Sequence, residues 1–425
     1  RRHLANFDNL PINVTMQAQV AIRPPSTTAH SVNPVVQWNR NLLSILRTPG
    51  AQPGTIHPTR SFAIMHAAVY DAVNAIDGTH HVYLVQIPGI SGDASQEAAA
   101  AAAAYEVLIA LYPTFQATLD IQLQQSLLQI PDGPNKERGI AIGQLVAAQT
   151  LALRSNDWSD VQPPPFVFGS APGDFQSTPP NFPKPQFTEW SHVTPFALLQ
   201  ASQFRPGHPP ALTSTSYRDA FNELKSLGIA RSTQTTVEEA LIGRFWNGAI
   251  QNYWNEITQT ATVAHKLTTA QSARLFALLN LSFADGVIAF YDAKYVYKLW
   301  RPITAIRAAD SDNNPDTTPD LNWVPEVGNT PPDPSYPGAH AVIAAVGANV
   351  LGSFFGSDQF TFSVTSEVMA GVERSFTTFT AAAEEATVSR IFAGVHFRTD
   401  LVAGKQLGMD VSTYVANTLL TPAVP

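Results

Sequence analysis

Apolar residues recur every three or four positions along much of the chain, which is the spacing of one face of an α-helix. The clearest apolar stripe ends before Gly78 and consists of Phe62, Met65, Val69, Val73 and Ile76. It predicts a buried helix over residues 60–77. The next helices, each begun beside a capping residue or a proline, are predicted at 95–111, 114–129 and 135–153. Four antiparallel helices with short loops are typical of a helical bundle.

Helical spacing resumes in the second half of the chain, and alternation of period two, which marks strands, is convincing nowhere. The predicted helical segments are 215–227, 236–256, 268–299, 338–354, 364–394 and 399–418. We therefore predict an all-α protein of two helical bundles with long Pro-rich connectors. The predicted parts are an N-terminal bundle over 1–161, a Pro/Phe-rich connector over 162–186 and a C-terminal bundle over 187–425.

Composition narrows the class of protein. The chain has 425 residues, 44% of them hydrophobic, which is enough for a large core. Its 25 basic residues against 33 acidic residues give a net charge of −8, which argues against nucleic acid as a partner. No run of about 18 apolar residues stands out, so we expect no transmembrane helix and no membrane partner. The absence of cysteine excludes disulfides and thiolate metal sites. We expect a soluble globular enzyme, either a monomer or a homodimer.

The N-terminal end and two short motifs bear on processing. The sequence starts at Arg1-Arg2-His3 rather than at Met, which indicates a trimmed N-terminus and favours a secreted or periplasmic protein. Glycosylation sequons occur at Asn13-Val14-Thr15 and at Asn280-Leu281-Ser282. The second lies in an apolar helical segment, so we expect it to be unmodified.

Three groups of cationic and imidazole side chains lie in the last third of the chain. They are Lys294 with Arg301-Pro302, then Pro337-Gly338-Ala339-His340, then Ser389-Arg390 with His396 and Asp400. Arginine forks and lysine point charges match the geometry of a tetrahedral oxyanion. If the fold brings the three groups together, they form a site for a phosphate-like group.

The first group has two interpretations. Lys294 and Arg301 are seven residues apart, almost two helical turns, which would place them on one face of a continuous helix. Pro302 disfavours helical geometry at Arg301, so we expect the helix to kink or end there. The alternative is a solvated basic edge of a helix.

The second and third groups also depend on local backbone geometry. His340 would lie in the first turn of a helix, whose free backbone N–H groups attract anions, although a single histidine after a loop is often structural. Arg390 and His396 converge only if the helix breaks between them, and Gly394 offers that break. Asp400 could then accept the second ring N–H of His396 and fix its tautomer.

Jointly the three groups resemble the signature of the superfamily of vanadium haloperoxidases and type 2 phosphatidic acid phosphatases. That signature reads Lys-x6-Arg-Pro, then Pro-Ser-Gly-His, then Ser-Arg-x5-His-x3-Asp, and here the first and third parts match fully over residues 294–400. In the length of the chain and in its two predicted bundles, the protein resembles members of the haloperoxidase branch.

The resemblance implies roles for these residues. The oxyanion-binding residues would be Lys294, Arg301, Gly338, Ala339 through its backbone N–H, and Arg390. In the haloperoxidase branch the cofactor would be vanadate, held by His396, and His340 would act as acid and base. Hydrogen peroxide and halide would then react there to give hypohalous acid. The catalytic set is His340, His396 and Asp400.

Two other functions remain open. Phosphate can occupy the same site, and in the phosphatase branch His396 would be the nucleophile that attacks a phosphomonoester while His340 protonates the leaving alcohol. The third alternative is a non-catalytic oxyanion-binding relative. It arises because Gly338 stands where the family has serine, which removes a hydroxyl donor worth about 1.5 to 3 kcal/mol. Ser335 lies five residues before His340 and is out of register with the missing serine.

The segment 308–336 is acidic. It carries Asp333 and five other carboxylates and no Lys or Arg, so it would form a rim that repels halide. Within it, alternating oxygen-bearing residues suggest a weak calcium candidate at Asp310, Asp312, Asn314 and Asp316. The sixth-position Gly and twelfth-position Glu of a calcium loop are absent, and a solvated acidic turn is the alternative.

Overall fold

The computed structural model describes residues 33–90 and 92–423. The Arg1-Arg2-His3 start and the sequon at Asn13 lie outside the described residues. The other sequon residue, Asn280, is fully buried inside a helix, where a glycan could not be accommodated.

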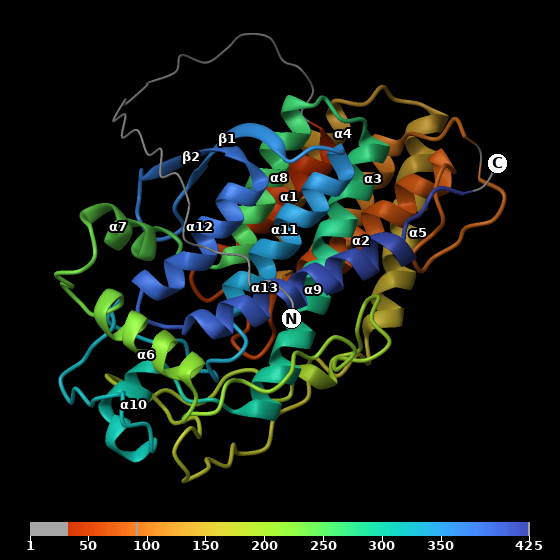
Figure 1. Cartoon of the computed structure of the whole chain (residues 1–425). Coiled ribbons are helices and arrows are strands. Elements are labelled where there is room, and N and C mark those ends of the chain that lie inside the picture. Colours follow the sequence, from red (N-terminus) through yellow and green to blue (C-terminus); the bar gives the residue numbers. More distant parts are fainter. Residues whose placement is uncertain (1–32, 91, 424–425) are drawn as a thin grey trace. The chain divides into compact units, whose positions relative to one another are not determined.

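Helices fill the first part of the described chain (Figure 1). They are α1 Pro34–Leu46, α2 Pro58–Asp77, α3 Gln96–Leu111, the short 3-10 helix η1 Pro113–Phe115, α4 Gln116–Leu128 and α5 Pro134–Arg154. The side chain of Ser95 caps α3, and α2 ends at Gly78 in the left-handed conformation, as helix signals in the sequence predict. The helix α1 was not predicted.

Small residues let α3 and α5 pack closely. The buried face of α3 is alanine, and Gly143 of α5 lies against it. A Cβ atom at Gly143 would stand 2.4 Å from the carbonyl oxygen of Ala99, so any side chain there would force the helices apart.

Helices also dominate the second part of the chain. They are η2 Trp190–His192, α6 Thr215–Leu227, α7 Val237–Phe245, α8 Ile250–Ala264, α9 Thr269–Tyr297, α10 Pro302–Arg307, η3 Ala309–Ser311, α11 Ala339–Phe355, α12 Phe379–Phe392 and α13 Arg398–Thr418. The all-α prediction is therefore confirmed in outline. The single helix predicted over 236–256 is wrong, because the chain breaks between α7 and α8.

The helix predicted over 364–394 is wrong in its first half. An antiparallel hairpin precedes α12 and consists of β1 Gln359–Thr365 and β2 Glu373–Thr378. Phe362 pairs with Phe376, and alternate side chains of both strands are buried. This is the period-two alternation that was judged absent from the sequence.

The long helix α9 lies at the centre of the fold and contacts α2, α11 and α13 (Figure 1). Among the described residues it is the one unbroken helix long and apolar enough to cross a membrane, which the sequence analysis overlooked. However, 94% of its most apolar 18-residue window is buried inside the protein, so α9 is a core helix.

The connector over 162–186 contains no helix or strand, and all of its residues are described. Its aromatic rings pack on one another and on the end of α9: Phe166 lies edge-on to Phe175 and to Tyr295. Residues on both sides of the connector share one hydrophobic core, in which His66 of α2 stacks on Phe276 of α9. The division at residues 161 and 186 remains a prediction.

A buried carboxylate ties a second loop to α9. Asp285 accepts three backbone N–H groups, from Phe196 at 2.6 Å, Ala197 at 2.7 Å and Leu198 at 2.8 Å. Burial raises the pKa of Asp285 to about 6 despite these donors. The carboxylate therefore fixes the loop that follows η2 against the central helix.

We expect Asp285→Ala to lower the free energy of unfolding by about 3 kcal/mol or more, because each buried N–H left without an acceptor costs about 1 to 3 kcal/mol. Urea denaturation measures the loss. Asp292→Ala, on the same helix, removes a bidentate ion pair with the partly exposed Arg205 and should cost about 1 kcal/mol or less. Equal losses in the two variants would contradict the assigned role of Asp285.

Candidate oxyanion-binding active site

The first cationic group lies where α9 ends. Lys294 is in the last turn of α9, which stops at Tyr297, and Arg301 has extended backbone angles and caps α10. The predicted effect of Pro302 on Arg301 is thus confirmed. The prediction that Lys294 and Arg301 share one helix face is wrong, because the helix ends between them, yet the turn still brings both side chains to one carboxylate.

Lys294 is fully buried and all three of its N–H donors have partners. It donates to the carbonyl oxygens of Pro334 and, at 3.5 Å, of Ser335, and it pairs with Oδ1 of Asp333 at 3.1 Å. Burial lowers the pKa of Lys294 to about 8, while the charge of Asp333 opposes that shift. The ammonium is therefore charged at neutral pH and held by main-chain oxygens and one carboxylate.

The guanidinium of Arg301 is also buried and has partners on three sides. Its Nε donates to the carbonyl oxygen of Asp333 at 2.7 Å and its Nη2 to Oδ1 of the same residue. Its Nη1 donates to the carbonyl oxygen of Val395 at 2.8 Å and faces Nε2 of His396 at 3.1 Å. Arg301 thus links the first group of the sequence signature to the third.

The second group opens α11. Gly338 is the N-cap and Ala339 begins the helix, so the N–H groups of the first turn have no acceptor within it. The N–H of Gly338 itself donates to the carbonyl oxygen of Asp400 at 2.9 Å, so the amide of Gly338 is committed to the fold. The half-buried His340 faces the carbonyl oxygen of Trp246 through Nε2 at 2.8 Å. Burial and the charge of Arg390 lower the pKa of His340 well below its usual value.

The third group depends on a break between α12 and α13. The break lies at Gly394, whose φ of +81° favours glycine and whose missing Cβ leaves room for the carbonyl oxygen of Gly228. This confirms the predicted break. Arg390, in the last turn of α12, is 1% exposed and donates from Nη2 to Asn247 at 3.0 Å. Burial and the charge of Arg301 lower the pKa of Arg390 to about 9.

Two donors of Arg390 distinguish it from the other cations. Its Nε and Nη1 are buried and have no hydrogen-bond partner among the described residues. Unpaired charged donors in a protein interior are costly unless an anion binds them. They are the donor set that an oxyanion requires, so the residues present fit vanadate or phosphate.

His396 is held in one tautomer. The ring is 3% exposed and its Nδ1 lies 3.1 Å from Oδ2 of Asp400. Because a guanidinium only donates, Nε2 facing Arg301 is the acceptor and the proton is on Nδ1. Burial, followed by the charges of Arg301 and Lys294, lowers the pKa of His396 well below its usual value. The imidazole is therefore neutral, with the Nε2 lone pair directed into the cationic cluster.

Asp400 is fully buried and organises the turn around His396. Its Oδ2 also accepts the hydroxyl of Ser335 and the backbone N–H of Phe397, at 3.1 Å. Burial raises the pKa of Asp400 to about 6. Ser335 thus supports the carboxylate, consistent with its being out of register with the family's serine.

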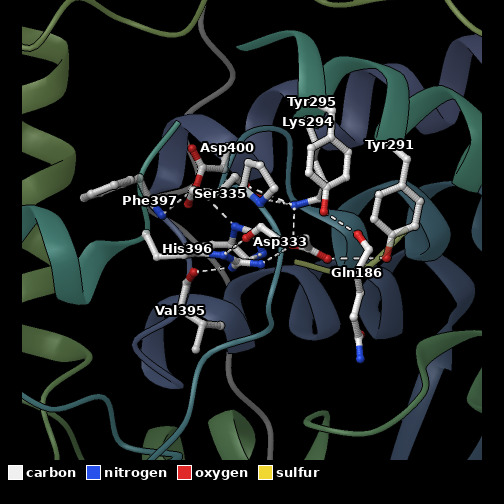
Figure 2. Close-up of polar contacts among 12 residues, drawn as sticks. Gln186, Tyr291, Lys294, Tyr295, Asp333, Ser335, Val395, His396, Phe397 and Asp400 are labelled. Atoms are coloured by element: carbon white, nitrogen blue, oxygen red, sulfur yellow. Dashed lines mark hydrogen bonds and ion pairs between the residues drawn. The ribbon is translucent and has the colours of Figure 1, made fainter. Parts of the chain in front are cut away.

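Figure 2 shows the resulting convergence: Lys294, Asp333, His396, Asp400 and Ser335 point toward one another. Arg301 contacts the ring of His396 directly, at 3.1 Å, and the charges of Lys294 and Arg390 also lower the pKa of that ring. The structure therefore brings the cations and histidines of the three groups together.

Asp333 is the site residue that the sequence analysis missed. It was assigned to the acidic rim, but its carboxylate contacts Lys294 and Arg301, and its Oδ2 accepts the hydroxyl of Tyr291 at 3.4 Å. The one feature of the sequence that could have identified Asp333 as a site residue is its position four residues before the Pro337-Gly338 motif. That position alone does not distinguish Asp333 from the other acidic residues of the segment. Trp246 and Asn247 gave no signal at all.

The calcium candidate is not supported. Asp312 accepts the N–H of Asn314 at 2.7 Å and the hydroxyl of Thr317 at 2.7 Å. Asp316 pairs with Arg218, and Asp310 is exposed. No group of three or more His, Asp or Glu side chains suited to a metal ion occurs within the described residues. The segment is a hydrogen-bonded acidic turn, and the solvated turn of the alternative interpretation holds for Asp310 and Asp316 but not for the buried Asp312 and Asn314.

The fold and the site together define a helical protein with a buried cluster of cations and histidines that is suited to an oxyanion. Residues 274–422 match the family model of the VCPO second helical-bundle domain. The vanadium chloroperoxidase of Curvularia inaequalis is 24% identical over an alignment that covers 90% of this chain and 81% of the relative. The chain is therefore similar to vanadium haloperoxidases in sequence and is haloperoxidase-like in fold.

Comparison with solved structures also finds vanadium-dependent haloperoxidases. The chain is similar to the first bacterial vanadium-dependent iodoperoxidase, with a TM-score of 0.78, 26% identity, and coverage of 95% of this chain and 99% of that one. It is also similar to a holo-type bacterial vanadium-dependent chloroperoxidase, with a TM-score of 0.63, 15% identity, and coverage of 93% and 94%. The second similarity concerns the fold alone.

Proposed function

We propose that this protein is a vanadate-dependent haloperoxidase that uses hydrogen peroxide to oxidise halide. The observation that carries the proposal is the geometry of His396. Its Nδ1 proton is held by Asp400, so the Nε2 lone pair faces a cluster of three buried cations. A neutral imidazole in that orientation is a ligand rather than a charge partner.

The residues that would hold vanadate are the ones that the geometry assembles. His396 would bind through Nε2, in place of its present contact with Nη1 of Arg301. Arg390, Arg301 and Lys294 would neutralise the oxyanion, with the first-turn N–H of Ala339 as a further donor. Bound vanadate supplies a Lewis-acid centre that activates peroxide toward halide. The protein contributes position, charge and exclusion of water.

His340 is suited to move a proton at this site. Its lowered pKa keeps the imidazole neutral at pH 7, so it can accept a proton from incoming peroxide. The carbonyl oxygen of Trp246, at 2.8 Å from Nε2, stabilises the protonated ring that results. His340 therefore acts as the base, and then as the acid, of the proposed reaction.

A phosphatase is the second candidate, and the orientation of His396 is the observation that favours it. With the proton on Nδ1 held by Asp400, Nε2 is a neutral nitrogen that suits a nucleophile as well as a ligand. His396 would then attack a phosphomonoester through Nε2, and His340 would protonate the leaving alcohol. The third candidate, an oxyanion binder without turnover, rests on the missing serine at Gly338.

Parallel assays of the metal-stripped protein separate the three candidates. Halide oxidation is followed with peroxide, bromide or iodide and a dimedone-type acceptor, before and after addition of orthovanadate, and hydrolysis of p-nitrophenyl phosphate is measured beside it. We expect vanadate to restore halide oxidation. Phosphate hydrolysis that vanadate inhibits, without halide oxidation, would overturn the proposal in favour of the phosphatase, and vanadate binding without either reaction would favour the silent binder.

Restoring the family's serine tests the effect of the departure at Gly338. A Cβ atom there would lie 2.9 Å from Cδ2 of Leu401, a mobile side-chain end, and 3.5 Å from the carbonyl oxygen of Asp400. We expect Gly338→Ser to bind orthovanadate about 10- to 150-fold more tightly than Gly338→Ala, since a charge-assisted hydrogen bond contributes about 1.5 to 3 kcal/mol. Titration calorimetry of the two variants, which carry the same Cβ, isolates the hydroxyl; equal affinities would refute its predicted contribution.

A further inference from the structure

The donors of Lys294 and Arg301 are almost fully used within the protein. Lys294 has three N–H donors, and all three have partners, one of which is the carboxylate of Asp333. Arg301 has five, and four of them are directed at Asp333, Val395 and His396. An oxyanion that is to contact Lys294, or more than one N–H of Arg301, must therefore take the place of an existing partner.

Among these partners, the carboxylate of Asp333 is the one that resembles an oxyanion. Its Oδ1 lies 3.1 Å from Nζ of Lys294 and accepts from Nη2 of Arg301, which are the contacts expected of an oxyanion oxygen. The carbonyl oxygens that accept hydrogen bonds from Lys294 and Arg301 are part of the main chain, so an oxyanion cannot displace them. The side chain of Asp333 can rotate away, because only its carboxylate is attached there.

The second carboxylate oxygen of Asp333 has a partner of its own. Its Oδ2 accepts the hydroxyl of Tyr291, at 3.4 Å. This hydrogen bond helps to hold the carboxylate in its present position, so it is weakened or lost when the side chain leaves the cations.

The formal charge of the site also indicates that the carboxylate of Asp333 competes with an oxyanion. Lys294, Arg301 and Arg390 carry three positive charges, and Asp333 and Asp400 carry two negative charges when both are ionised. The site thus has a formal charge of +1 with the carboxylate in place, which suits a singly charged oxyanion. Without the charge of Asp333 it would be +2.

We propose that Asp333 is a built-in competitor for the oxyanion site, whose carboxylate occupies the Lys294–Arg301 arm and must move for vanadate or phosphate to bind. This proposal rests on the proposed function of the same site. Arg390, whose Nε and Nη1 have no partner, is the first contact of the incoming anion. Asp333 thereby sets the affinity of the site for tetrahedral oxyanions.

Binding of orthovanadate and of inorganic phosphate to the full chain, measured by titration calorimetry, tests the proposal without relying on turnover. Asp333→Asn keeps the shape of the side chain and removes its charge, so we expect both anions to bind at least about tenfold more tightly. Asp310→Asn is the matched control: it makes the same change of net charge at an exposed position of the same segment and should leave both affinities unchanged.

Unchanged or weaker binding by Asp333→Asn would overturn the proposal, because it would make Asp333 a support for Lys294 and Arg301 rather than a competitor. If neither anion binds the wild type or the variant, the oxyanion site itself fails and the proposed function fails with it. Tyr291→Phe provides a second variant in case Asp333→Asn does not fold. It removes the hydrogen bond on Oδ2 that holds the carboxylate in position, and we expect about twofold to threefold tighter binding.

Discussion

Replacing His396 with alanine is expected to abolish vanadate-dependent halide oxidation. The imidazole presents the lone pair of a neutral nitrogen, Nε2, to the cations, so its removal deletes the proposed bond to vanadium. Loss of an outer partner such as Asp400 weakens metal sites by about 10- to 100-fold, and loss of the ligand itself should exceed that range. The measurement is the rate of peroxide-dependent bromination or iodination at saturating orthovanadate.

Two further variants complete this test. Asp400→Asn keeps an oxygen acceptor for Nδ1 of His396 and should fall in the intermediate range of about 10- to 100-fold. His192→Ala removes an exposed imidazole far outside the cluster and should retain full activity. Turnover in His396→Ala comparable to the wild type would exclude His396 as the ligand.

Replacing Arg390 with methionine is the second large effect that we expect. Two buried, charge-assisted hydrogen bonds to the oxyanion would be lost, each worth about 1.5 to 3 kcal/mol, which together weaken orthovanadate binding by about 10²- to 10⁴-fold. Titration calorimetry measures the change in affinity.

The same substitution should not destabilise the unliganded protein. Burial lowers the pKa of Arg390 to about 9, which shows that its charge is poorly compensated there, and an apolar side chain of similar length removes that cost. We therefore expect a melting temperature equal to or above that of the wild type. Arg218→Met, at a partly exposed position, is the control and should change neither property. Loss of stability together with loss of binding would indicate a structural role for Arg390 instead.

A regular apolar face or a recognisable capping residue made a helix predictable from the sequence. The stripe that ends at Ile76 and the cap at Ser95 predicted α2 and α3 correctly, because caps and apolar spacing are local properties. The hairpin β1–β2 was missed because β2 was absorbed into the helix predicted over 364–394, while most of β1 was left without an assignment. The break between α7 and α8 was missed although Gly248 lies within it, because a single glycine inside a helical pattern is often tolerated.

The sequence predicted those site residues whose spacing along the chain, together with nearby Gly and Pro residues, indicates how the backbone turns. Gly394 indicated the turn that brings Arg390 and His396 together, and Pro302 indicated the extended geometry of Arg301, so the convergence followed from backbone preferences. The position of Asp333 did not follow, because it depends on how a Pro-rich segment packs over the end of α9. Long-range packing of irregular segments has no periodic signal in sequence.

The most direct test of the account is the equilibrium binding of orthovanadate to the metal-stripped wild-type protein, with phosphate as competitor. The account predicts one site per chain, mutual exclusion of vanadate and phosphate, and loss of the vanadate site in His396→Ala. Stoichiometric vanadate binding that survives His396→Ala, or that phosphate does not displace, would contradict the claim that the histidine and the three cations form one oxyanion-binding active site.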